Sequence, residues 1–264
     1  MLMDLGIKGK IAIVSGASAG IGAAVVARLA SEGVRVVACA RNEARLQKAV
    51  QDSKAARSGE ILGFAADCAK QKDVDALVEF AVSSFGGVDI LVNLLAGPKT
   101  AEFFELSDED WHEALNLKLM GQIRCARTVF PLMKAKNWGR IINVIGTHGH
   151  QPHAYLMSAG VVNAGLLNFT KALAELGAPH GILVNAVNPG PIETERMAYV
   201  LSAKSAQHNI SIEEARRQWE EGTLLKRYGL PNEIAAVVAF LASDLASYVT
   251  GTSIDVDGGQ TQGV

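Results

Sequence analysis

The segment KIAIVSGASAGIG, residues 10–22, decides the fold of this chain. Its first half is a short apolar run that predicts a buried strand, and the residues AAVVARLA after it predict a helix. Gly16, Gly20 and Gly22 lie in the turn between the two. Missing Cβ atoms and free N–H groups at a helix N-terminus favour a phosphate group. We therefore expect a dinucleotide pyrophosphate here, although a tight strand-to-helix turn without a ligand fits the same spacing.

Composition limits the possible partners. The 264 residues are 49% hydrophobic and 20% charged, which suits one core and a single domain over residues 1–264. A net charge of -2 provides no basic field for nucleic acid or a membrane surface. We expect a small-molecule substrate and further copies of the chain as partners.

The termini and cysteines indicate the compartment. No signal-peptide pattern opens the chain, and no apolar run approaches the ~18 residues of a membrane span. Three cysteines without CxxC spacing fit neither a disulfide framework nor a zinc site. We expect reduced thiols, no bound metal and a cytoplasmic protein.

Strand and helix patterns alternate along the chain. Apolar strands are expected at 34–40, 61–67, 88–97, 139–146, 181–190 and 252–259, and helices at 74–85, 107–136, 154–176 and from 231. Strands that are apolar throughout and alternate with helices predict an α/β protein with a parallel sheet covered on both faces. Ligands of such sheets bind at the carboxyl ends of the strands.

The end of the second strand bears on the cofactor. In units of this kind that bind NAD, an acidic residue there accepts hydrogen bonds from the ribose. Here the tip is Cys39, Ala40 and Arg41, so a 2′-phosphate meets a guanidinium and no carboxylate. This favours NADP(H) over NAD(H). The alternative is that Arg41 is a solvated charge at a helix start.

Residues 191–228 depart from the alternation. They are polar, charged and helical in pattern. Such an excursion beside a strand-end site is either a lid over the substrate or a solvated surface segment. We expect a substrate lid at about 191–228.

Five motifs occur in order: SGASAGIG at 15–22, Asp67-Cys68, DILVN ending at Asn93, NPGPIET at 188–194 and VTGTSIDVDGG near the C-terminus. Along nearly its whole length the chain resembles the short-chain dehydrogenase/reductase family. The resemblance implies a Rossmann-type doubly wound sheet of about seven parallel strands, in the order 3-2-1-4-5-6-7. It also implies a homo-oligomer, either a dimer or a homotetramer.

The resemblance assigns cofactor roles by position. The residues implied to hold the pyrophosphate are Gly16, Ser18, Gly20, Ile21 and Gly22. Arg41 would bind the 2′-phosphate, Asp67 and Cys68 the adenine, and Asn93 the adenosine side. The residues implied to face the nicotinamide amide are Pro189, Gly190, Ile192 and Thr194.

The catalytic signature of the family is missing. The family has a Ser at the end of the fifth strand, a Tyr and a Lys on the next helix, and an Asn on the preceding helix. An ungapped alignment on GRIINV and NFTKALA places Gly146, Ala159, Asn163 and Lys118 at these positions. A Tyr with a lowered pKa protonates the carbonyl in the family, so this chain needs another donor.

Neighbouring residues offer replacements. Tyr155 precedes Ala159 by one turn if the helix is regular, and Thr147 follows Gly146. Lys118 could supply the lost cation, and Asn163 could position water or a side chain. The predicted catalytic set is therefore Tyr155, Thr147, Lys118 and Asn163. Each of the four also fits an ordinary structural role.

The function expected from these features is hydride transfer between NADP(H) and a carbonyl or alcohol substrate. Two alternatives remain open at this point. One is a nucleotide-binding protein without reductase turnover, with a sensor or assembly role. The other is a lyase or isomerase on the same fold.

Overall fold

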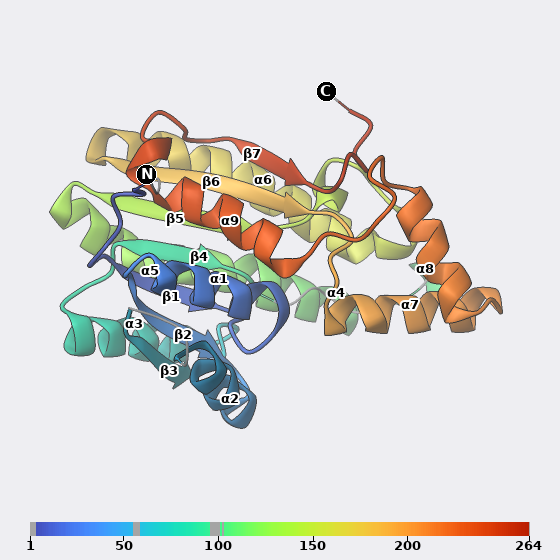
Figure 1. Cartoon of the computed structure of the whole chain (residues 1–264), viewed down its shortest axis with the longest axis horizontal. Helices are drawn as coiled ribbons and strands as arrows, with labels where there is room; N and C mark the ends of the chain where they lie inside the picture. Colours follow the sequence, from blue (N-terminus) through green and yellow to red (C-terminus); the bar gives the residue numbers. More distant parts are fainter. Residues whose placement is uncertain (1–3, 55–58, 96–100, 102, 264) are drawn as a thin grey trace.

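The computed structural model describes residues 4–54, 59–95, 101 and 103–263, and these form one α/β domain (Figure 1). Its strands form a seven-stranded parallel sheet in the order β3-β2-β1-β4-β5-β6-β7. The strands are β1 Ile11–Ser15, β2 Arg35–Ala40, β3 Ile61–Ala65, β4 Ile90–Asn93, β5 Gly139–Val144, β6 Ile182–Pro189 and β7 Ser253–Val256. Both the doubly wound fold and its strand order are confirmed. The expected extension of the fourth strand to residue 97 lies partly outside the described residues.

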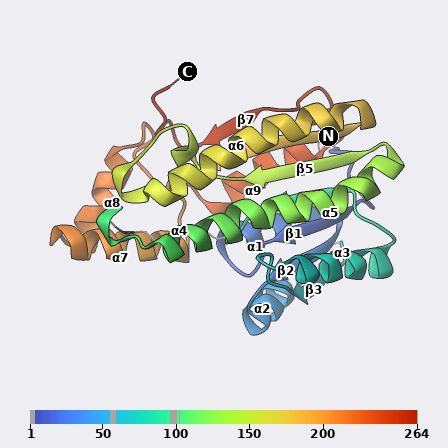
Figure 2. The ribbon, with the colours of Figure 1, turned by 180° about the vertical axis from the view of Figure 1, so that it is seen from behind.

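Helices cover both faces of the sheet. They are α1 Gly20–Ser31, α2 Glu43–Lys54, α3 Gln71–Phe85, α4 Asp108–Ala114, α5 Gly121–Lys136, α6 Met157–Gly177, α7 Glu195–His208, α8 Ile212–Glu221 and α9 Pro231–Ala242. Helices α1, α2 and α9 lie on one face, and α3, α5 and α6 lie on the other (Figures 1 and 2). Alternate residues of one strand point to opposite faces, so Ala12 and Val14 join the core under α1 and α9, whereas Ile11 and Ile13 join the core under α3 and α5.

The helix expected over 107–136 is divided in three. Ser107 caps α4 by accepting a hydrogen bond from the backbone N–H of Asp110, as the sequence indicates. A π-helical segment, η2 Leu115–Met120, then separates α4 from α5. Short π-helical insertions occur often at functional sites, and this one carries Lys118.

The helix expected from Ala154 begins later. Ala154–Leu156 form a 3₁₀ turn, η4, and α6 begins at Met157. His153 is extended and its ring accepts a hydrogen bond from the backbone N–H of Tyr155, which ends the loop in a separate turn. Tyr155 therefore lies outside the regular helix, and the condition under which it precedes Ala159 by one helical turn is not met.

The segment after β6 lies beyond the carboxyl ends of the strands. It contains α7 and α8, which stand at the end of the sheet toward which the strand arrows point in Figure 1. These two helices thus flank the carboxyl end of the sheet. No helix in the described ranges is both long and apolar enough to cross a membrane.

Candidate functional site

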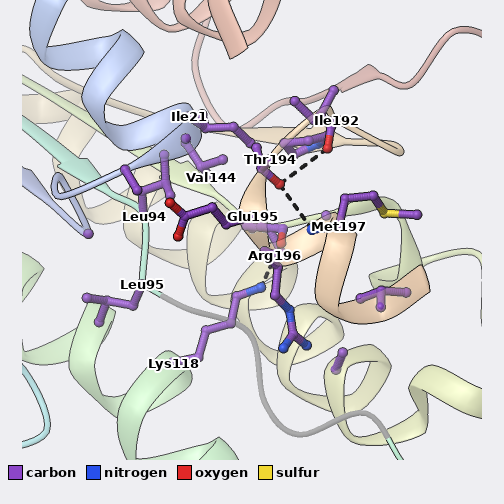
Figure 3. Close-up of a pocket in the computed structure, with 18 of the residues that line it drawn as sticks. Ile21, Leu94, Leu95, Lys118, Val144, Ile192, Thr194, Glu195, Arg196 and Met197 are labelled. Atoms are coloured by element: carbon purple, nitrogen blue, oxygen red, sulfur yellow. Dashed lines mark hydrogen bonds between the residues drawn. The ribbon is translucent and has the colours of Figure 1, made fainter. Parts of the chain in front are cut away.

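A pocket of about 600 Å³ lies at the carboxyl end of the sheet. The β1–α1 turn, the end of β2, the segment after β5 and the start of α7 all contribute to its wall. Figure 3 shows part of this wall, with residues from the first half of the chain facing residues of α7. Its position at the carboxyl ends of parallel strands is where α/β sheets bind ligands.

The β1–α1 turn presents backbone groups to the pocket. Gly16 has a φ of 69°, and a Cβ there would collide with the carbonyl oxygen of Leu94. Gly20 opens α1 with a φ of 53°. The preceding residue, Ala19, provides no side-chain cap, and the first turn of α1 contains no acidic residue. The N-terminal N–H groups of α1 therefore lack a side-chain acceptor, which suits a bound phosphate.

The end of β2 adds positive charge to the pocket. Arg41 is exposed and lines the pocket, without a hydrogen bond or ion pair to the residues that the structure describes. Arg45, one turn along in α2, forms an ion pair with Glu195 at the start of α7. The arrangement around Arg41 fits a phosphate on the adenosine ribose, since no carboxylate occupies the tip of the strand.

Three buried thiols lie near the ends of β2 and β3, and two of them reach the pocket wall. Cys39, Cys68 and Cys125 are all free, and the first two line the pocket. Hydrogen bonds from the thiols of Cys125 and Cys39 lower the pKa of Cys68 to about 4. Cys39 and Cys68 thus place two small side chains in the pocket wall.

The segment after β6 closes the opposite wall. Pro189, Gly190, Ile192 and Thr194 all line the pocket. The hydroxyl of Thr194 donates to the carbonyl of Ile192 and accepts from the backbone N–H of Met197 at 3.2 Å (Figure 3). Thr194 is thereby the N-cap of α7, which fixes the direction in which this helix leaves the pocket.

Lys118 is the buried cation of the pocket. Its Nζ donates to the carbonyl of Ile145 and to Oδ1 of Asn163, each at 2.7 Å. Burial, together with the charge of the Arg196 guanidinium, lowers the pKa of Lys118 to about 7. An amine with such a pKa exchanges protons near neutral pH.

Gly146 and Thr147 follow β5 beside this amine. Gly146 has a φ of 127°, and a Cβ there would lie 3.1 Å from Nδ2 of Asn163. That Nδ2 donates to the Gly146 carbonyl, so the Asn163 amide links α6 to both the Gly146 carbonyl and Lys118. Thr147 is buried and lines the pocket. Three segments thus meet around the Lys118 amine.

Comparisons with known proteins agree with this architecture. A family model described as enoyl-(acyl carrier protein) reductase matches residues 16–261. The 3-oxoacyl-[acyl-carrier-protein] reductase FabG of Aquifex aeolicus is 35% identical over 258 residues, which cover 97% of this chain and 99% of its own. The chain belongs to the short-chain dehydrogenase/reductase family.

Two solved structures of such enzymes match the whole chain. The L-sorbose reductase of Gluconobacter frateurii, complexed with NADPH and L-sorbose, has a TM-score of 0.93 and 34% identity, covering 99% of this chain and 100% of its own. A variant of actinorhodin polyketide ketoreductase with NADPH has a TM-score of 0.93 and 34% identity, covering 100% of both chains. The fold of this short-chain dehydrogenase/reductase is therefore that of NADPH-bound reductases.

Most cofactor residues predicted for this short-chain dehydrogenase/reductase reach the pocket wall. Those that line it are Gly16, Ser18, Gly20, Ile21, Arg41, Cys68, Pro189, Gly190, Ile192 and Thr194. Gly22 instead packs against the Gly16 carbonyl, where a Cβ would collide. Asp67 accepts from the backbone N–H of Ala69, and Asn93 is fully buried and donates to Asn143. Gly22, Asp67 and Asn93 support the wall without lining it.

The predicted catalytic residues separate into two groups. Lys118, Thr147 and Asn163 line the pocket, and Lys118 contacts Asn163 directly. Tyr155 does not line it: its ring packs against His208 and His153, with centroids 5.1 and 5.7 Å away. The 3₁₀ turn at Ala154–Leu156 places the phenol outside the pocket wall.

Sequence reasoning missed Arg196, Trp219 and Gln260, which also line the pocket of this short-chain dehydrogenase/reductase. The indole Nε1 of Trp219 and Oε1 of Gln260 are buried without a hydrogen-bond partner in the described part of the chain. Only Arg196 had a signal in the sequence, because it follows the NPGPIET motif at the first turn of the next helix.

Proposed function

We propose that this protein is an NADP(H)-dependent oxidoreductase that transfers hydride between the nicotinamide and a carbonyl or alcohol substrate, with Lys118 as its acid/base group. The observation that carries this proposal is the buried Lys118 amine, which lines the same pocket as the cofactor-facing glycines. The NADPH in the two matching reductase structures supports the cofactor. Arg41, with no carboxylate beside it at the strand tip, supports NADP(H) over NAD(H).

Different parts of the pocket would bind the two ends of the cofactor and transfer the proton. The uncapped N-terminus of α1 would hold the pyrophosphate, and the β6–α7 segment would hold the nicotinamide end. When bound, the nicotinamide supplies or accepts the hydride. Lys118 donates the proton to the substrate oxygen during reduction and removes it during oxidation. Asn163 and the Ile145 carbonyl hold the amine at 2.7 Å, so its position does not depend on the substrate.

The constellation differs from that of the family. Gly146 and Ala159 stand where the resemblance expects the hydroxyls of Ser and Tyr, and neither side chain can donate a proton. Thr147 lines the pocket next to Gly146 and can supply a hydroxyl to the substrate oxygen. A lysine with a pKa near 7 has the protonation balance that the family obtains from its Tyr.

The segment 191–228 is proposed as the substrate lid. Thr194, the N-cap of α7, lines the pocket together with residues 195–197 and Val200 of that helix, and α8 contributes Trp219. The Arg45–Glu195 ion pair joins this segment to the cofactor side of the pocket. Closure of the segment would exclude water from the substrate beside the buried Lys118 amine, so that proton transfer is directed to the substrate.

The test is transfer of deuterium from C4 of labelled NADPH to a panel of ketones, aldehydes and acyl thioesters, with products analysed by mass spectrometry. We expect deuterium in at least one product for the unmodified protein and for Lys72→Met, an exposed lysine on α3. Lys118→Met should bind NADPH and transfer little label. Tight NADPH binding with no transfer by the unmodified protein would instead favour a nucleotide-binding role without turnover.

A further inference from the structure

The segment 191–228 has a small hydrophobic core of its own, separate from the clusters on the two faces of the sheet. Its buried members are Met197, Leu201, Ala215 and Tyr228. Val200 and Trp219 pack against this core, remain only partly buried, and line the pocket together with Met197. These three side chains therefore turn an apolar surface toward the pocket.

Two aromatic rings from separate segments meet at this surface. The imidazole of His148, in the 3₁₀ turn η3 Thr147–Gly149, and the indole of Trp219 both line the pocket. Their centroids are 6.4 Å apart, and the ring planes make an angle of 65°. Aromatic rings pack in offset stacked or edge-to-face arrangements at centroid distances of about 4.5–7 Å. A third flat ring can therefore stack against one of these rings and meet the edge of the other.

The indole is held in position by contacts within the chain. His153 stacks on Trp219 with centroids 6.0 Å apart and an interplanar angle of 23°, and Nζ of Lys204 lies 5.8 Å from the ring centroid. The ring of His153 also lies 5.7 Å from that of His148. A ligand with a ring therefore meets a surface that is already formed, which lowers the entropy cost of binding.

The ring pair lies close to the proposed proton donor. Burial lowers the pKa of His148, so its imidazole is neutral at neutral pH, and the charge of Lys118 adds to this shift. Leu117, the residue before Lys118 in η2, and Leu156 extend the apolar lining. A carbonyl compound whose oxygen faces Lys118 therefore has an apolar wall with two rings within reach of its substituent.

We propose that the substrate is a ketone or aldehyde that carries an aromatic ring, or the corresponding alcohol, and that Trp219 determines this specificity by packing against the ring. This rests on the proposed function of the same pocket. The ring of the substrate would bury its apolar surface against Met197, Val200 and the indole. Pairs of aromatic rings gain stability beyond the area that they bury. A saturated ring of the same size obtains the first contribution and not the second.

Binding without turnover tests this proposal. NADPH-loaded protein has no oxidised nicotinamide to accept a hydride, so alcohols bind to it without reacting. The probes are 1-phenylethanol and 1-cyclohexylethanol, which differ only in the saturation of the ring, and both are titrated by calorimetry. We expect the phenyl compound to bind about three- to tenfold more tightly, the effect of an aromatic pair. Equal affinities, tighter binding of the cyclohexyl compound, or no binding of either would overturn the proposal.

Variants of Trp219 identify the ring responsible. Trp219→Leu keeps an apolar side chain and removes the ring, so the two alcohols should bind equally. Trp219→Phe keeps a smaller ring and should retain part of the preference. Trp111→Leu is the matched control and should keep the full preference, because Trp111 lies on α4 and does not line the pocket. Melting temperature and NADPH affinity serve as folding controls. A full phenyl preference in folded Trp219→Leu would also overturn the proposal.

The outcomes separate this inference from the proposed function. A phenyl preference that depends on Trp219, in a protein that never transfers deuterium, supports the ring site and contradicts the reductase. Deuterium transfer to aliphatic ketones by a protein without a phenyl preference supports the reductase and contradicts the aromatic substrate.

Discussion

The two sides of the pocket are built in different ways. The side proposed for the cofactor is formed by the β1–α1 turn, the end of β2 and the β6–α7 segment, and is called the cofactor side below. It presents mainly backbone groups whose positions follow from glycine conformation and a helix N-terminus. The side proposed for the substrate, called the substrate side below, presents side chains from four separate segments: Lys118, Thr147, Asn163 and Arg196. The chemistry of the substrate side can therefore change while the cofactor side stays the same.

The largest expected effect is a loss of turnover from a mutation on the substrate side. Lys118→Met should lower kcat for reduction by about 10²- to 10⁴-fold, the usual contribution of a positioned acid. The dissociation constant of NADPH should change little, because the cofactor side does not use this amine. Stopped-flow turnover and NADPH fluorescence titration measure the two quantities. A parallel loss of NADPH affinity would show that the two sides are not independent.

The pH dependence of stability tests the burial of Lys118 without any activity assay. Its pKa falls from an ordinary value near 10.5 to about 7, so between these pH values the unfolded chain binds a proton that the folded chain lacks. Stability should therefore rise with pH across this window, by at most about 5 kcal/mol at 1.36 kcal/mol per pKa unit.

Urea unfolding at about pH 6 and about pH 9, for the unmodified protein and Lys118→Met, measures the part of this rise that accumulates by about pH 9. As the pH rises, only the unmodified protein should gain free energy of unfolding from the loss of the proton on Lys118. If the free energy of unfolding has the same pH dependence in both proteins, the Lys118 ammonium group lies in water. That result would contradict a buried proton donor.

A smaller effect is expected on the cofactor side. Arg41→Ala should weaken NADPH binding about tenfold through loss of one charge-assisted phosphate contact, and leave NADH binding unchanged. Lys48→Ala on α2 is a suitable control, because that exposed lysine pairs with Asp52 and does not line the pocket. If Arg41→Ala loses affinity for NADPH and NADH equally, Arg41 is not the reason for a cofactor preference.

The smallest effect concerns Tyr155. Its phenol packs against His208 and does not line the pocket, so Tyr155→Phe should change kcat less than about threefold. The assay is the same turnover measurement used for Lys118→Met. A loss as large as that of Lys118→Met would return the phenol to the role of proton donor.

Much of the fold and the cofactor side could be predicted before the structure. The alternating apolar strands indicated a parallel sheet, and the resemblance to the family implied its strand order. The glycines at 16, 20 and 22 indicated the turn that positions α1. The position of Tyr155 could not be predicted, because it depends on where α6 begins. His153 caps a separate turn there, and a three-residue shift in the helix start moves a side chain to another part of the wall.

The sequence by itself determined the elements whose geometry is local: a strand, a glycine turn and a helix start fix their own backbone within a few residues. Only the tertiary structure decided how Lys118 and Arg196 meet, since η2 and α7 are far apart in the chain and join only when the sheet and its helices are assembled. The tertiary structure likewise decided the pKa of the Lys118 amine. A lysine pKa depends on how much water and which charges surround it, and those are properties of the packed molecule.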